Sequence, residues 1–149
     1  MATTITPFQA TWAPRALGAL RIVAGYLFIA HGTAKLFGAP HVAMFDGLQL
    51  FSLMGLAGVL EVLGAALLIV GLFTRPVAFV LSGFMAVAYF MAHASQGNAL
   101  LPIANGGELA VLYSFLFLFI AAAGGGAFAV DNLLRSRTGN ATGNAYAGV

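Results

Sequence analysis

The fold is decided by residues 16–37, which read ALGALRIVAGYLFIAHGTAKLF. A helix of about 20 predominantly apolar residues is long enough to cross the hydrocarbon core of a bilayer. Three more runs of similar length and character follow, at residues 52–73, 76–94 and 106–127. Because backbone groups inside a bilayer must pair with one another, each run is predicted to be a helix. The sequence therefore predicts an all-α membrane protein with four spans.

The composition of the whole chain agrees with this interpretation. Of the 149 residues, 61% are hydrophobic and only 7% are charged, against about 25% in a typical soluble domain. The few polar side chains could not cover a soluble fold, so the lipid bilayer is the expected surrounding. The net charge of +2 is then a topology signal and predicts no nucleic-acid partner. The absence of cysteine excludes disulfides, thiol catalysis and cysteine-ligated iron–sulfur clusters.

The basic residues predict the direction of the helices. Arg15 and Arg21 lie at the start of the first run, Arg75 lies between the second and third, and Arg135 and Arg137 follow the fourth. Cytoplasmic loops carry an excess of Lys and Arg. Because four spans place both ends of the chain on one side, we expect an N-in and C-in protein of the bacterial inner membrane.

Three parts are expected along the chain. Residues 1–15 form a cytoplasmic segment, residues 16–134 form the membrane domain, and residues 135–149 form a disordered cytoplasmic tail. Near the end of the membrane domain, Asp131 is predicted to be the N-cap of a short helix on the cytoplasmic face.

Small residues predict how the helices pack. Gly18, Gly25 and Gly32 recur every seven residues and fall on one face of the first run. In the second run, glycines stand three residues before and three residues after Glu61. Helices in a bilayer associate through close backbone approach at small residues and through polar contacts. A left-handed four-helix bundle is therefore expected.

Polar side chains are predicted to gather in the outer half of this bundle. Glu61 lies roughly 14 Å into the second run at 1.5 Å per residue. A charge near the bilayer centre costs about 2.5 to 3.5 kcal/mol, so Glu61 should be protonated or paired; the candidate partners are Lys35, His31 and Arg21. The residues predicted to bind a ligand are His31, Lys35, Glu61, Tyr89, His93, Asn105 and Glu108, with Arg21, alone in the inner half, as a structural charge partner.

Most of these residues also have an ordinary structural explanation. Lys35 can extend to the lipid headgroups, the histidines can be hydrogen-bonded core residues, and Glu108 can cap the fourth helix. Glu61 lies too deep for such an explanation, and the gathering of the set favours a functional pocket. A metal site is not predicted, because no His and Glu share the spacing of a helical metal motif and a protonated Lys repels a cation.

Several short motifs occur in a fixed order across the four runs. In that order and spacing, over residues 15–134, the chain resembles the DoxX family of small bacterial inner-membrane proteins. The motifs that carry the resemblance are Arg21, His31-Gly32, Lys35-Leu36-Phe37-Gly38, Gly58-x-x-Glu61-x-x-Gly64, Gly71-Leu72-Phe73-Thr74-Arg75, Ala92-His93, Asn105-Gly106-Gly107-Glu108 and an element from Gly124 to Asp131.

The resemblance implies a fold and a class of ligand. The family is similar to the membrane subunit of thiosulfate:quinone oxidoreductase, and its members are linked to membrane oxidoreductase complexes and to quinone or thiol stress. It therefore implies a quinone-interacting subunit, with a membrane or soluble redox protein as its partner. Phe28 and Tyr113 would add aromatic surface to the polar set. No covalently bound cofactor is expected, and the isolated chain is not expected to be an active enzyme.

Two other functions stay open. The small size, the short loops and the absence of cofactor ligands also suit a structural or assembly subunit of a membrane complex. A permease for a small solute or proton is the third alternative, although the broken or repeated helices of transporters are not evident. A quinone that co-purifies with the protein would support only the first of the three.

Overall fold

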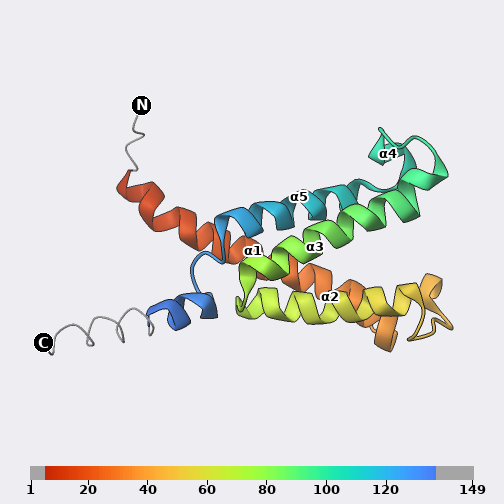
Figure 1. Ribbon diagram of the computed structural model, residues 1–149, viewed down its shortest axis with the longest axis horizontal. Helices are drawn as coiled ribbons and strands as arrows, with labels where there is room; N and C mark the ends of the chain where they lie inside the picture. The colour runs from red at the N-terminus through yellow and green to blue at the C-terminus, as the bar shows by residue number, and fades with distance from the viewer. Residues whose placement is uncertain (1–5, 137–149) are drawn as a thin grey trace, which may run out of the picture.

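The structure, a computed structural model, describes residues 6–136, and within them it is all-helical (Figure 1). Residues 1–5 and 137–149, which include Arg137 and most of the predicted tail, lie outside the described residues. A final helical segment covers residues 130–136. The preceding elements are α1 (Pro7–Phe37), η1 (Ala43–Phe45), α2 (Leu53–Val70), α3 (Thr74–Ala88), η2 (Tyr89–His93), η3 (Ala94–Gln96), α4 (Pro102–Asn105) and α5 (Glu108–Ala123).

Three helical stretches are long and apolar enough to cross a membrane: Pro7–Phe37, Leu53–Val70 and Thr74–Gln96. The fourth predicted run, 106–127, is shorter than expected. Its helix α5 has 16 residues, or about 24 Å at 1.5 Å per residue, against a hydrocarbon core of about 30 Å. It ends because Gly124 adopts a φ of 96°. The all-α prediction is confirmed, and three of the four runs reach spanning length as helices.

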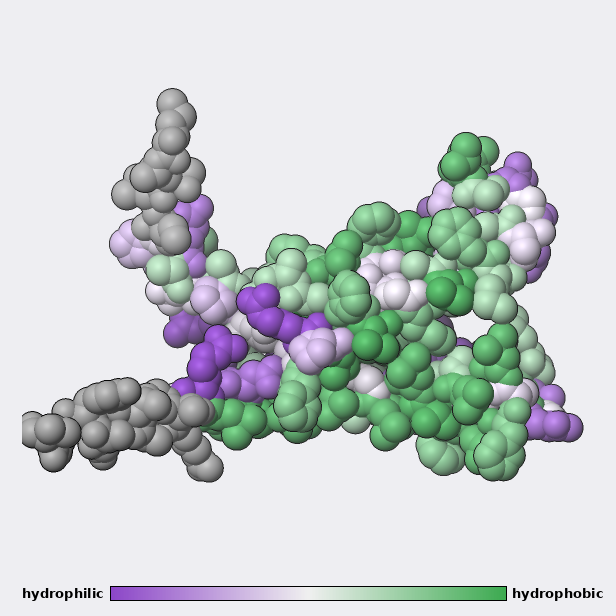
Figure 2. Space-filling view, viewed as in Figure 1, coloured by the Kyte–Doolittle hydropathy of each residue, from purple (hydrophilic) through white to green (hydrophobic). Residues whose placement is uncertain are grey.

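The helices pair as two hairpins (Figure 1). α1 packs along α2 and α3 packs along α5, whereas α2 and α3 contact each other less extensively. The hairpins meet at the end that holds the α2–α3 turn, called here the inner end after the predicted topology, and diverge toward the outer end, which holds η1 and α4 (Figure 1). Apolar residues cover the middle of the molecule in Figure 2, and hydrophilic residues gather at the inner end and at the outer loops.

The glycines of α1 lie where the helix meets other backbone, as predicted. A Cβ at Gly25 would come 2.8 Å from Cγ1 of Ile69 on α2. A Cβ at Gly18 would come 2.4 Å from the carbonyl oxygen of Ala127, in the segment that follows α5. Both distances are shorter than real Cβ contacts, so a larger residue would force the Ile69 side chain to shift at Gly25 and the backbone to move at Gly18.

Arg21 is fully buried and binds main-chain carbonyl oxygens. Its guanidinium donates to Leu68 and Ile69, in the last turn of α2, and to Gly125 and Phe128 after α5. Carbonyl groups in the last turn of a helix have no intrahelical partner, and the helix dipole favours a cation there. Arg21 is therefore not the candidate that binds Glu61: within residues 6–136, its hydrogen bonds go to carbonyl groups and not to a carboxylate.

Asp131 caps α3 and not its own helix. Its carboxylate accepts hydrogen bonds from the backbone N–H groups of Phe73 and Thr74, each at 2.8 Å. It already lies inside the helical segment 130–136, which overturns the prediction that it is the N-cap there. Burial raises the pKa of Asp131, but the hydrogen bonds from Thr74 and Phe73 and the nearby charge of Arg135 outweigh burial and hold that pKa below its ordinary value.

Candidate functional site

Lys35 and Glu61 form a buried ion pair between α1 and α2. Lys35 Nζ lies 2.5 Å from Glu61 Oε1, and the two side chains are 11% and 5% exposed. Of the three candidate partners for Glu61, Lys35 is therefore the one that binds it. A charge in the apolar part of a membrane is tolerated when it is paired in the protein interior, and this contact supplies that pairing.

Glu61 uses only one of its carboxylate oxygens in this pair. Oε2 is buried and accepts no hydrogen bond from any residue that the structure describes. An unpaired buried polar group costs about 1 to 3 kcal/mol, and such groups are rare in native structures. Oε2 is therefore available to a hydrogen-bond donor from outside the chain.

His31 lies beside the ion pair and links the two hairpins. It stands one helical turn before Lys35 on α1, is exposed and interacts electrostatically with Glu61. Its ring meets Tyr113 of α5 edge-on, with the ring centroids 6.5 Å apart. Tyr113 in turn contacts Phe28 at 5.2 Å. The acid–base groups thus border a buried aromatic cluster.

The loop between α1 and α2 covers Lys35. The ring centroid of Phe45, in η1, lies 5.6 Å from Lys35 Nζ, a distance at which a cation is attracted to an aromatic face. On the exposed side of the same loop, His41 Nε2 lies 3.0 Å from Asp46 Oδ1. No signal in the sequence singles out Phe45, because it falls in a connection without helical periodicity, where the path of the loop decides what it covers.

Tyr89, His93 and Asn105 form a separate polar network on the other hairpin. The hydroxyl of Tyr89 donates to the carbonyl of Ala99 at 2.6 Å and accepts from Asn105 Nδ2 at 3.2 Å. His93 Nδ1 lies 3.1 Å from the carbonyl oxygen of Asn105. Tyr89 and His93 begin and end the single π-helical turn η2, a feature frequent at functional sites. Here the three side chains close the loop between α3 and α5.

Glu108 lies apart from both groups. It is exposed in the first turn of α5, where a negative charge interacts favourably with the helix dipole. The predicted ligand-binding residues therefore fall into separate groups. His31, Lys35 and Glu61 lie together on the hairpin of α1 and α2. Tyr89, His93 and Asn105 bond to one another and to the loop of the hairpin of α3 and α5, and Glu108 belongs to neither group. Within residues 6–136, no group of three or more His, Asp or Glu side chains could hold a metal ion.

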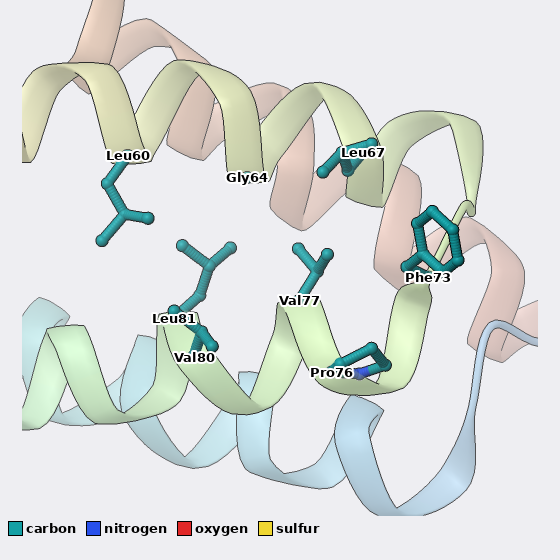
Figure 3. Close-up of a pocket in the computed structure, with 8 residues that line it drawn as sticks. All are labelled: Leu60, Gly64, Leu67, Phe73, Pro76, Val77, Val80 and Leu81. Carbon is teal, nitrogen blue, oxygen red and sulfur yellow. The ribbon is translucent and has the colours of Figure 1, made fainter.

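An apolar groove with a volume of about 310 Å³ lies between α2 and α3. Figure 3 shows Leu60 and Leu67 of α2 facing Val77 and Leu81 of α3 across it. A Cβ at Gly64 would come 2.7 Å from Leu81, so the glycine lets the leucine fit. The residues that line the groove are Leu60, Gly64, Leu67, Phe73, Pro76, Val77, Val80 and Leu81.

Comparisons with known proteins point to one family. The chain matches the DoxX family over residues 16–94, more than half of its length. A Haemophilus influenzae protein described as uncharacterized is 52% identical to it over 122 residues, which cover 80% of this chain and 90% of that protein. No solved structure matches the chain.

Proposed function

The chain belongs to the DoxX family, and from this premise we propose that it binds a quinone ring at the Lys35–Glu61 pair as a subunit of a membrane oxidoreductase system. The proposal includes an inner-membrane location, with both termini in the cytoplasm and α5 as a fourth, short span. A partner protein supplies the electrons, because the chain offers no cysteine and no recognisable flavin or haem motif.

The observation that carries the proposal is the buried ion pair with its free carboxylate oxygen. Small-molecule sites are mostly apolar and aromatic, with a few polar groups that orient the ligand. The aromatic surface here comes from Phe28 and Tyr113, and the polar groups are Lys35, Glu61 and His31. A quinone also needs groups that exchange protons with its oxygens, and carboxylates and imidazoles are suited to that task.

Each polar residue has a defined part in this proposal. An ammonium group carries three N–H donors, so Lys35 can bond to Glu61 Oε1 and still donate to a ring oxygen. Glu61 orients Lys35 and, as an ionised carboxylate, accepts a proton at Oε2. His31, which is exposed, passes protons between Glu61 and the surroundings. The bound quinone would supply the capacity to carry electrons together with protons.

A second candidate function is that of a structural or assembly subunit. It is favoured by the groove between α2 and α3, whose lining is entirely apolar and suits the side chains of a neighbouring helix. It is also favoured by the network of Tyr89, His93 and Asn105, because those groups are occupied by local hydrogen bonds.

Equilibrium dialysis of the purified protein against duroquinone tests the proposed function. We expect saturable binding that His31→Ala and Glu61→Ala each weaken by about tenfold or more, the effect of losing roughly 1.4 kcal/mol. Leu63→Ala is the matched control, because Leu63 lies on α2 two residues from Glu61 and is exposed. His93→Ala should have a smaller effect than His31→Ala. Stoichiometric co-purification of a partner without any quinone binding would favour the assembly role instead.

A further inference from the structure

We infer that the site at Lys35 and Glu61 prefers the hydroxyl-bearing, reduced form of its ligand, a hydroquinone, to the quinone itself. The inference rests on the proposed function and adds the chemical form that the site recognises. It is carried by Glu61 Oε2. Glu61 is only 4% exposed, and Oε2 has no hydrogen-bond partner within the described part of the chain.

The preference follows from which atoms donate and which accept. An ionised carboxylate accepts hydrogen bonds and cannot donate them. The ring oxygens of a quinone are carbonyl oxygens and also only accept, so a quinone placed against Oε2 would leave both groups unpaired. A hydroquinone presents an O–H group, which can donate to Oε2 in a short, charge-assisted hydrogen bond. A buried site that bonds a hydroxyl rejects an analogue without one, because its own polar group then stays unsatisfied.

The other polar groups of the site do not make this distinction. Lys35 Nζ donates to Glu61 Oε1, and its remaining N–H groups can donate to an oxygen of either ligand form. His31 can donate or accept, depending on which ring nitrogen carries the proton. Discrimination between the two forms is therefore assigned to Oε2 alone.

A ligand must reach Oε2, which is buried, and the divergence of the two hairpins is the approach that we propose. The two hairpins diverge toward the outer end, where Figure 2 shows the molecule notched between its two arms. His31 of α1 and Tyr113 of α5 still make ring contact across the hairpins, which places the ion pair near the point where the arms separate. On the loop side, Phe45 covers Lys35, so we expect a flat ring to enter between the hairpins.

The test compares one ligand in its two oxidation states. Binding of durohydroquinone, kept reduced with dithionite under argon, and of duroquinone is measured by equilibrium dialysis. The reductant breaks no disulfide, because the chain has no cysteine. We expect the wild-type protein to bind durohydroquinone about tenfold more tightly. In Glu61→Gln the amide N–H₂ can donate to a carbonyl, so the preference should fall below about threefold. Leu63→Ala should keep the wild-type preference.

Each outcome decides a separate point. Equal binding of the two forms by the wild-type protein, or tighter binding of duroquinone, overturns the inference and leaves the proposed function standing. Saturable binding of neither form overturns both. A tenfold preference that persists in Glu61→Gln assigns the discrimination to another group and also overturns the inference. The decisive comparison uses the wild-type protein and so does not depend on the folding of a variant, and the helical content of each variant is checked by circular dichroism.

Discussion

Gly32 of α1 lies so close to Gly58 of α2 that a Cβ at Gly32 would come 2.8 Å from the Gly58 carbonyl oxygen. The two members of the ion pair each follow one of these glycines by three residues: Lys35 follows Gly32, and Glu61 follows Gly58. Three residues is about one helical turn, so the pairs lie on the same faces of their helices. The close approach of the two backbones therefore brings Nζ to the carboxylate.

The first prediction concerns this approach. Gly32→Ala should lower the free energy of unfolding by about 1 to 3 kcal/mol, because the new methyl group has no space and α1 must move away from α2. Gly83→Ala on α3 is the control: a Cβ there meets nothing within 4 Å, so the change should be neutral or stabilise by up to about 1 kcal/mol. Denaturant unfolding followed by circular dichroism measures both, and equal effects of the two variants would contradict the packing described.

The second prediction concerns the ion pair. Lys35→Met or Glu61→Gln alone should each destabilise the protein by about 3 to 5 kcal/mol, because each removes one member of a buried pair. The double variant should lose less than the sum of the single losses, and the difference measures the coupling. Glu108→Gln changes an exposed acid and should shift stability by less than about 0.5 kcal/mol. Strictly additive losses would show that the two side chains do not interact.

The third prediction concerns Arg21. Arg21→Lys should destabilise the protein by about 3 kcal/mol, because an ammonium group cannot reproduce the planar set of donors that reaches several carbonyl groups at once. Arg15→Lys is the matched control, because Arg15 is exposed. Thermal unfolding of the two variants side by side measures the difference. A loss no greater than that of Arg15→Lys would rule out a structural role for the buried guanidinium.

The fourth prediction concerns the cap that Asp131 provides for α3. Asp131→Asn should cost about 1 kcal/mol near neutral pH, because the two carboxylate oxygens accept from two backbone N–H groups and an amide keeps only one of these acceptors. Because the pKa of Asp131 is held below its ordinary value of 3.8, the contribution of the ionised carboxylate is complete above the unfolded-state pKa of about 3.9. It is lost as the pH falls through the lower folded-state pKa. Stability curves of the wild-type protein and of the variant should therefore converge in acid, and a constant gap down to the lowest pH would count against the cap.

The fifth prediction concerns topology. A reporter active only in the periplasm should be active when inserted at Gly97, between α3 and α5, and silent when fused after Val149. The test is needed because Arg75, one of the residues that predict orientation, also donates hydrogen bonds to the carbonyls of Ala121 and Ala122 at the end of α5. A basic residue at that position therefore has a structural role besides a topological one. The reverse pattern of activity would show that the end called inner, with the α2–α3 turn, faces the periplasm.

The sequence by itself determined the helical class, the three helical stretches of spanning length and the requirement that Glu61 be protonated or paired, with Lys35 among three candidate partners. These features depend on local sequence pattern and on the large free-energy cost of unpaired polar groups in a bilayer. An apolar run must pair its backbone groups internally, and a deep carboxylate must be protonated or lie next to an opposite charge. The packing face of α1 was also predictable from the sequence, because glycines that repeat every seven residues fall on one face of a helix.

Only the tertiary structure decided how the polar groups are divided and what the helix ends bind. Asp131 is 57 residues from Thr74 along the chain, and Arg21 is 104 residues from Gly125. No local pattern reports such contacts. Likewise, the positions of Tyr89 and His93 along their helix predicted their depth in the membrane. Depth alone does not determine whether such a side chain faces Glu61 or, as here, bonds to the loop between α3 and α5. That choice depends on the angle at which the hairpins diverge, which is set by side-chain packing between segments far apart in the sequence.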